Sequence, residues 1–587
     1  MTGDIMTKCI FSTNLLFRKL PLFSTAADIP LALKQAASMR YYLLLCLFMT
    51  VGSLGIHAQR EFPSDFKFGV GTSAYQIEGA WDQDGKGESI WDYLVHNHPE
   101  KIGDRTNGDV ACDSYRLWRR DVEMLKDLGV DVYRFSIAWT RIMPTGISNQ
   151  INMAGVEYYN NLINALLENN ITPLVVLYHW DLPQRLQQLG GWTNREVVGH
   201  FREYARFVFA TFGDRVKWWT TFNEPLQTCR QSYEWDAMAP GYEFPGIPSY
   251  LCTHHLLLSH AEAVEVYRTQ FQPEQNGKIG ITVDSSWAEP RSDSADDQEA
   301  AETNLQFLIG WFMHPIYSAN GNYPQIMIDR IATLSQQQGF AKSRLPTFSA
   351  EEINKLKGSS DFFGFNTYTT YIAYKNDDQN SANFPLPSYD HDRGVVEYQD
   401  PSWPETGSNW FRVYPKGIYN LLKWINKEYN NPEVYITENG YSDRGGTRDE
   451  GRVQYFKDYM SAVLDAIDEG CKVKGYIAWS LMDNFEWRAG LIERFGLYYV
   501  DYEHPNRTRT QKSSAKFYAN VIETRKIDMD YMPEPEEIIT TPEPEESTTL
   551  TPDDSSTTTE DPGAGVMVVS SLSLILSAVV LTLKQMF

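Results

Sequence analysis

Short apolar runs alternate with amphipathic segments from residue 66 to residue 480. Eight of these runs have the β-branched and aromatic content of strands: Phe66–Ser73, Val130–Ile137, Ile171–Tyr178, Val216–Phe222, Lys278–Val283, Asp361–Asn366, Glu433–Thr437 and Val473–Trp479. Between most of them, apolar residues recur every three or four positions, which predicts helices, as in Tyr115–Leu128, Val156–Leu167, Val197–Phe212, Leu256–Phe271 and Tyr455–Ile467. Strands that alternate with helices favour a parallel sheet, and eight such units favour a closed barrel. The predicted fold is α/β, a single (β/α)8 TIM barrel with extended loops over residues 59–527.

The pattern changes at three places outside the regular units. The stretch from Asn376 to Ser408 is rich in Asn, Asp and Pro, which predicts a long loop. Residues 528–565 contain mostly Pro, Glu, Asp, Ser and Thr, which predicts a disordered acidic stalk that carries O-linked glycans. Residues 566–587 form a hydrophobic tail behind the small residues Asp554-Ser555-Ser556. This order favours a lipid-anchor (GPI) signal, and a single transmembrane span is the alternative.

Residues 1–58 have the pattern of a targeting segment. The apolar run from Tyr41 to Gly55 follows Arg40 and precedes Ala58, which predicts a signal peptide cleaved after Ala58. Residues 1–38 would be an unusually long leading region, so we expect the true start at Met39. A retained membrane anchor is the alternative, although the run is short for a span. We therefore expect a protein of the secretory pathway, extracellular and anchored to the cell surface through its C-terminus.

Charge and cysteine content narrow the partners and cofactors. The net charge is −24, and no basic cluster is present, which argues against nucleic acid as a partner. Four cysteines follow the predicted cleavage point, and they lack the spacing of a metal site. We expect no metal and no organic cofactor, because the paired-carboxylate chemistry described below needs neither. Cys229 and Cys252 would close a local disulfide in a secreted chain, and free buried thiols are an equal alternative. Asn170 and Asn506 begin N-glycosylation sequons.

Two of the predicted strands run directly into a glutamate. Glu438-Asn439-Gly440 follows one strand, and Asn223-Glu224-Pro225 follows another. The carboxyl ends of barrel strands meet at one face, so both carboxylates are expected in one pocket. Such a pair can hydrolyse a glycoside, because an ionised carboxylate attacks the anomeric carbon while a protonated one donates to the leaving oxygen. Asn223 would supply an amide for a sugar hydroxyl. The alternative to a catalytic pair is that both glutamates are buried structural residues.

Six ordered motifs connect these glutamates to a known family. They are Phe68–Gly79, Tyr133–Trp139, His179–Pro183, Thr221–Pro225, Ile436–Gly440 and Trp479–Trp487. With these motifs the chain resembles the family 1 glycoside hydrolases, of the β-glucosidase and lactase type, from Phe62 to about Ile522. The resemblance implies that Glu438 is the nucleophile and Glu224 the acid/base.

The same resemblance implies roles for the surrounding residues. Arg134 and Tyr368 would keep the nucleophile charged and oriented, and Tyr368 would also contact substrate. The groups that would hold the sugar in the first subsite are Gln76, His179, Asn223, Glu486, Trp479 and Trp487. Glu486 disfavours phosphorylated sugars by its charge. The loop from Gln227 to Tyr250 and residues 488–492 depart from the family pattern, which leaves the leaving-group preference open.

These expectations define one main function and two alternatives. Transglycosylation would use the same residues as hydrolysis and differ only in the acceptor, so the sequence leaves it open. We expect a retaining β-glycosidase that hydrolyses β-D-glucosides by double displacement, with galactosides and fucosides as further substrates. The substrate would be a small-molecule or oligosaccharide β-glycoside, and the membrane would be contacted only through the C-terminal tail. One alternative is a membrane-tethered, catalytically weak barrel that binds glycans or proteins. The other is a thioglucosidase, since the retained Glu224 does not separate O-glycosides from S-glycosides.

Overall fold

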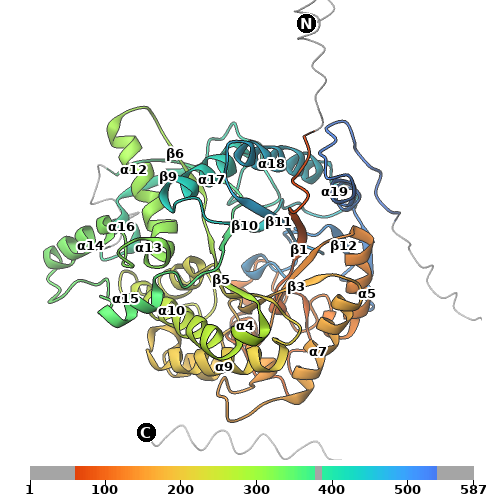
Figure 1. Cartoon of the computed structure of the whole chain (residues 1–587), viewed down its shortest axis with the longest axis horizontal. Coiled ribbons are helices and arrows are strands. Elements are labelled where there is room, and N and C mark those ends of the chain that lie inside the picture. Colours follow the sequence, from red (N-terminus) through yellow and green to blue (C-terminus); the bar gives the residue numbers. More distant parts are fainter. Residues whose placement is uncertain (1–59, 377–385, 538–587) are drawn as a thin grey trace, which may run out of the picture. The chain divides into compact units, whose positions relative to one another are not determined.

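The computed structural model describes residues 60–376 and 386–537 (Figure 1). The predicted signal peptide, most of the predicted stalk and the hydrophobic tail lie outside these residues. Within the two described ranges, the helices are either too short or too polar to cross a membrane.

Eight parallel strands close into a barrel in the order β1-β11-β10-β7-β5-β4-β3-β2. Their bounds are Lys67–Gly71 (β1), Val132–Ser136 (β2), Thr172–Tyr178 (β3), Trp218–Asn223 (β4), Lys278–Asp284 (β5), Phe363–Asn366 (β7), Val434–Asn439 (β10) and Val473–Trp479 (β11). Each strand coincides with one predicted run, so the predicted barrel is confirmed. Apart from their first residues, these strands are almost entirely buried, because the barrel interior covers one face and helices cover the other.

Helices surround the barrel (Figure 1). The long ones are α5 (Ser114–Leu128), α7 (Met153–Glu168), α9 (Glu196–Phe212), α10 (Pro248–Val266), α14 (Gln325–Gln337), α17 (Lys416–Glu428), α18 (Glu450–Asp468) and α19 (Ser513–Thr524). The shorter ones are α3 (Ala74–Ile77), α4 (Ile90–Asn97), α6 (Trp139–Ile142), α8 (Gln184–Gln188), α11 (Gln272–Gln275), α12 (Ala295–Leu305), α13 (Trp311–Tyr317), α15 (Ala350–Leu356) and α16 (Tyr389–Arg393). The predicted helix that begins at Leu256 starts earlier, at Pro248, because α10 is buried on nearly every side and buries Ser249, Thr253 and His254. Its polar residues therefore do not mark a solvent face.

A second, three-stranded sheet lies outside the barrel in the order β6-β8-β9. It consists of β6 (Trp287–Pro290), β8 (Thr370–Lys375) and β9 (Val395–Tyr398), and β12 (Tyr498–Val500) pairs with β13 (Arg509–Gln511) elsewhere. The prediction that residues 376–408 are loop is wrong for α16 and β9. These short elements depend on tertiary pairing, since β9 pairs antiparallel with β8, and local sequence therefore gives little sign of them.

Residues 528–537, which the sequence places in the acidic tail, lie against the barrel. The ring of Tyr531 stacks on Phe517 of α19, with ring centroids 6.5 Å apart. The N–H of Glu536 donates to the carbonyl oxygen of Gln511 at 3.0 Å, and Lys457 donates to the carbonyl oxygen of Met529 at 2.8 Å. The described body therefore extends beyond the predicted boundary at residue 527.

The loop after β4 is tied to α10 by a disulfide. Cys229 and Cys252 are joined, with their Cα atoms 5.4 Å apart, whereas Cys112 and Cys471 are buried free thiols. Asn170 and Asn506, the two sequon asparagines, are both exposed. Each of them is accessible to the glycosylation that its sequon predicts.

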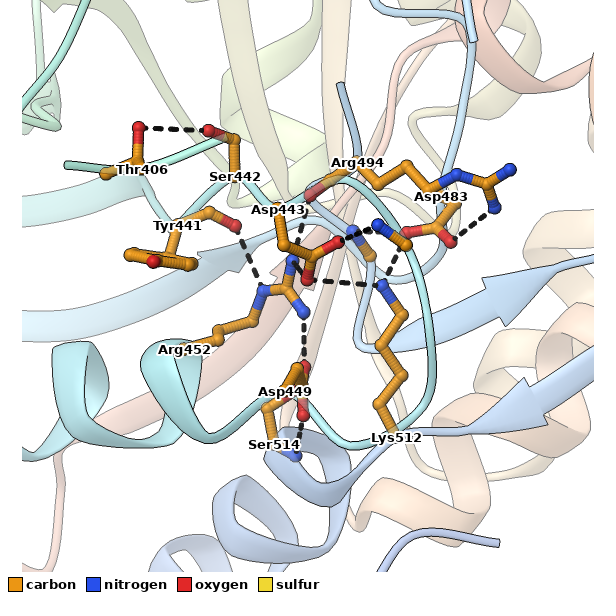
Figure 2. A network of polar contacts seen from close by, with 12 residues as sticks. Thr406, Tyr441, Ser442, Asp443, Asp449, Arg452, Asp483, Arg494, Lys512 and Ser514 are labelled. Atoms are coloured by element: carbon orange, nitrogen blue, oxygen red, sulfur yellow. Dashed lines mark hydrogen bonds and ion pairs between the residues drawn. The ribbon is translucent and has the colours of Figure 1, made fainter. Parts of the chain in front are cut away.

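A buried network of charges connects the loops that follow β10 and β11 (Figure 2). Lys512 lies between two aspartates, with its Nζ 2.8 Å from Asp483 Oδ1 and 3.7 Å from Asp443 Oδ2. Arg452 of α18 contacts Asp443 at 2.6 Å and also pairs with Asp449. The side chains of Lys512, Arg452 and Asp483 are fully buried. This network holds the chain after Glu438 to the chain that carries Glu486 and to the start of α19.

Substitution of Lys512 by Met should strongly destabilise the fold. It would leave Asp483 and Asp443 in the interior without this cation, which costs about 3–5 kcal/mol for a broken buried ion pair. Urea unfolding followed by tryptophan fluorescence measures the loss. Lys516→Met, at a half-exposed position on α19, the helix that Lys512 precedes, is the matched control, and equal losses in both variants would contradict a stabilising role for the network.

Candidate active site

Glu438 occupies the carboxyl end of β10 and is held by two donors. Arg134 of β2 donates from Nη1 to Glu438 Oε1 at 2.6 Å. The hydroxyl of Tyr368 donates to Glu438 Oε2 at 2.8 Å. The side chains of Arg134 and Glu438 are 0% and 4% exposed, so the pair is screened from water. Both carboxylate oxygens therefore have a donor in a fixed direction, which orients the group and favours its ionised form.

Glu224 follows β4 directly and takes an unusual backbone conformation. Its φ of 49° lies in the left-handed region that non-glycine residues rarely adopt. Its N–H donates to the carbonyl oxygen of Thr282 on β5 at 3.0 Å, and Asn366 Nδ2 donates to its Oε1 at 2.8 Å. Strained backbone of this kind is concentrated at functional sites, where surrounding contacts hold it in place.

Asn223 links the surroundings of the two glutamates. Its Oδ1 accepts from Arg134 Nη2 at 2.5 Å and from Asn366 Nδ2 at 3.0 Å. Asn366 donates to Glu224 as well, while its own Oδ1 accepts from Thr437 at 2.7 Å. A continuous set of hydrogen bonds thus runs from Glu438 through Arg134, Asn223 and Asn366 to Glu224. The barrel brings together side chains from four strands at its C-terminal face.

His179 is oriented for a ligand by the same amide. Asn223 Nδ2 donates to His179 Nε2 at 3.1 Å, which places the ring proton on Nδ1. Among the described residues, that Nδ1 has no hydrogen-bond partner. Burial, reinforced by the charge of Arg134, lowers the pKa of His179 well below its usual value, so the ring is neutral. His179 can therefore donate one hydrogen bond to a neutral hydroxyl.

Gln76 and Glu486 form a second polar group in the site. Gln76 Nε2 donates to Glu486 Oε2 at 3.2 Å and to Asn484 Oδ1 at 2.9 Å. Burial, together with the charges of Glu493 and Glu438, raises the pKa of Glu486 well above its usual value. An amide and a carboxyl group at this place can together bind vicinal hydroxyls.

Aromatic rings stand beside these polar groups. The ring of His179 is nearly parallel to those of Trp479 and Trp487, at centroid distances of 5.9 Å and 6.0 Å. Gly440 lies against the backbone of Trp479, because a Cβ at residue 440 would lie 2.0 Å from the Trp479 carbonyl oxygen. Trp487 has a φ of 48°, so it shares the left-handed conformation of Glu224. The flat faces suit the C–H side of a pyranose ring.

The two glutamates differ in their electrostatic surroundings. Burial raises the pKa of both carboxyls. For Glu224, the charges of Asp284 and Glu438 add to this effect, and its pKa lies well above its usual value. For Glu438, Arg134 and the hydrogen bond from Tyr368 act in the opposite direction. The arrangement therefore favours a protonated Glu224 beside an ionised Glu438, which is the division of labour that acid-assisted displacement needs.

The structure brings the residues predicted from sequence into one site and adds two that the prediction omitted. Asn366 holds Glu224, and Asp284 ends β5 on the strand beside it. Their only sequence signal is a polar residue at a strand end. The loop from Gln227 to Tyr250 reaches the same face, because Arg488 next to Trp487 donates to the Asp236 carbonyl oxygen at 2.5 Å. Within the described residues, His, Cys, Asp and Glu side chains nowhere form a group of three or more that could hold a metal ion.

Comparisons with known proteins agree with this geometry. A family model described as Glycosyl hydrolase family 1 matches residues 58–527. Myrosinase 1 of Brevicoryne brassicae is 45% identical over 469 residues, which cover 79% of this chain and 99% of that protein. The lactase-like protein of Homo sapiens is 45% identical over 468 residues, 78% of this chain and 82% of that protein. The lactase/phlorizin hydrolase of Rattus norvegicus is 47% identical over 79% of this chain, but the match spans only 24% of that longer protein.

Solved structures give the same result. Aphid myrosinase superposes with a TM-score of 0.76 at 45% identity, covering 80% of this chain and 100% of that one. The rice Os3BGlu6 β-glucosidase superposes with a TM-score of 0.74 at 40% identity, covering 78% and 98%. This chain therefore belongs to glycosyl hydrolase family 1 and is a retaining glycoside hydrolase, as its motifs predict.

Substitution of Tyr368 by Phe should move the acid limb of the pH profile of kcat/KM to higher pH. The hydroxyl lowers the pKa of Glu438, so its removal makes the carboxylate easier to protonate. A lost hydrogen bond to a charged group corresponds to a shift of about one pH unit. Tyr419→Phe, which removes a hydroxyl from the carboxylate of Glu469 on the outer surface, is the matched control. An unmoved acid limb in Tyr368→Phe would contradict the assigned contact.

Proposed function

We propose that this chain hydrolyses β-D-glucosides, with Glu438 as nucleophile and Glu224 as acid/base. The observation that carries the proposal is the unequal environment of the two carboxyls. Glu438 has an arginine and a tyrosine hydroxyl on its oxygens, whereas Glu224 has one amide donor and lies near two other carboxyls. The first group is suited to attack and the second to proton donation.

In the first step, an ionised Glu438 oxygen forms a bond to the anomeric carbon as the glycosidic bond breaks. Glu224 gives its proton to the departing oxygen, so the leaving group departs as an alcohol. Arg134 and Tyr368 hold the attacking carboxylate in place. After this step Glu438 is a neutral ester and Glu224 is a carboxylate. Glu224 can therefore serve as the base of the next step.

In the second step, Glu224 takes a proton from water, and the water oxygen forms a bond to the anomeric carbon of the glycosyl–Glu438 ester. The ester breaks, Glu438 leaves as a carboxylate, and Glu224 is protonated again. Two inversions give net retention at the anomeric carbon. A mutant of the rice Os3BGlu6 β-glucosidase, a homologue in structure, is described in covalent complex with Glc, which supports a glycosyl-enzyme intermediate for this chain.

The preference for an unphosphorylated hexoside is supported by the sugar-binding groups. Glu486 with Gln76 offers a carboxyl and an amide to adjacent hydroxyls, and His179 offers a single N–H. A phosphate would meet the carboxyl of Glu486 with no arginine or lysine bonded to it among the described residues. Galactosides, which differ from glucosides in configuration at one ring carbon, and fucosides, which in addition lack the 6-hydroxyl, are proposed as further substrates.

A second candidate is a thioglucosidase. It is favoured by the similarity to Myrosinase 1 of Brevicoryne brassicae over nearly the whole of that protein. A sulfur leaving group needs less protonation than an alkoxide. A comparison of an S-glucoside with the matching O-glucoside separates the two candidates.

Substitutions of the two glutamates test the proposed roles. Glu438→Gln should abolish turnover of every substrate, because the amide cannot form the glycosyl ester. Glu224→Gln should lower the hydrolysis of alkyl β-glucosides by about 10²–10⁴-fold, the range of general acid catalysis. It should slow the first step far less with 2,4-dinitrophenyl β-glucoside, whose leaving group needs no proton.

The measurement is burst and steady-state kinetics with both substrate types. The burst reports the first step, and the steady state reports hydrolysis of the ester. Equal losses of the first step with alkyl and dinitrophenyl glucosides in Glu224→Gln would contradict its role as the acid. Turnover in Glu438→Gln would contradict its role as the nucleophile.

A further inference from the structure

Asp284 places a third carboxyl group beside the two glutamates. It is the last residue of β5, the strand between β4 and β7 in the barrel. Its register partner on β7 is Asn366, whose amide donates to Glu224 at 2.8 Å. The N–H of Glu224 donates to Thr282, two residues before Asp284 on the same strand. The backbone thus fixes Asp284 next to the proposed acid/base.

The carboxyl of Asp284 is held but not neutralised. Gln227 Nε2 donates to its Oδ2 at 2.7 Å, while Oδ1 is buried and has no hydrogen-bond partner among the described residues. Asp284 is only 9% exposed. Within the described ranges it makes no ion pair, whereas Glu438 is paired with Arg134. Unlike the charge of Glu438, the charge of Asp284 therefore has no cation in contact with it among the described residues.

We propose that Asp284 is a positioning residue for the proton of Glu224. The carboxylate of Asp284 keeps that proton on Glu224 until the glycosidic oxygen accepts it. This proposal rests on the proposed role of Glu224 as acid/base. The balance of the step is unchanged: the proton leaves Glu224 for the leaving group, and Asp284 gains and loses nothing.

The charges around Glu224 support this role. Besides Asp284 from β5, Glu224 faces Glu438 from β10 and Arg134 from β2, with Tyr368 nearby. The neutral His179 is bonded to Asn223, the residue before Glu224. After burial, Asp284 is the largest cause of the raised pKa of Glu224, ahead of Glu438. Arg134 opposes the effect of Glu438 because it is bonded to that carboxylate.

Asp284 itself is ionised where the effect is needed. Burial raises its pKa to about 6, against the donor Gln227 and the charge of Arg230. Above that pH its negative charge disfavours a second negative charge on Glu224. In the second step, the same charge makes the ionised Glu224 a stronger base toward water. One residue thus assists Glu224 in both directions of proton transfer.

Asp284→Asn removes the charge and keeps the shape of the side chain. The alkaline limb of kcat/KM, measured with an alkyl β-glucoside, should move to lower pH by about one unit, because a like charge has been removed from beside Glu224. Asp284→Glu keeps the charge and should retain the wild-type alkaline limb. Asp293→Asn, at an exposed position before α12, makes the same change of net charge and should leave the profile unchanged.

An infrared titration gives a readout that does not need turnover. The carboxyl C=O band that disappears in Glu224→Gln belongs to protonated Glu224, and its titration midpoint should fall in Asp284→Asn. An unchanged midpoint, or a lower rate at every pH with an unmoved alkaline limb, would overturn the proposal and leave Asp284 a structural role only. Failure of the proposed function would give a different result, because Glu438→Gln would then retain turnover. The infrared midpoint of Glu224 would still show whether Asp284 affects its protonation.

Discussion

The buried contact between Arg134 and Glu438 is the constraint around which the site is arranged. A carboxylate removed from water is costly unless a cation and hydrogen bonds compensate it. Arg134 compensates Glu438 and, with its other terminal nitrogen, orients Asn223. Asn223 in turn fixes the tautomer of His179. One guanidinium therefore keeps the proposed nucleophile ionised and determines the direction of two sugar-binding groups.

The remaining architecture holds this arrangement in place. Glu224 and Trp487 have strained left-handed backbones, which persist only where their surroundings are rigid. The network of Asp443, Lys512 and Asp483 supplies rigidity behind the chains that follow β10 and β11 (Figure 2). The stability of this network is thus coupled to the geometry of the site, because the two loops that contain Asp443 and Asp483 also adjoin Glu438 and contain Glu486.

Much of this could be predicted from sequence, for a physical reason. Barrel strands are buried on both faces and read as apolar runs, and the residue after each run must lie at the catalytic face, as Glu438 does. The roles of Asn366 and Asp284 could not be predicted, because a polar strand end looks the same whether or not it meets Glu224. The helix α16 and strand β9 were missed because pairing with β8, rather than local propensity, stabilises them. The packing of Tyr531 on Phe517 was hidden by the tail-like composition around it.

The central claim is that Glu438 forms a covalent bond to the sugar. A 2-deoxy-2-fluoro-β-glucoside with a dinitrophenolate leaving group tests it directly, since the fluorine slows hydrolysis of the ester and lets it accumulate. We expect a mass increase of one fluoroglucosyl group per chain, located by peptide mapping at Glu438. Release of dinitrophenolate with the label on another residue, or with no label at all, would contradict it.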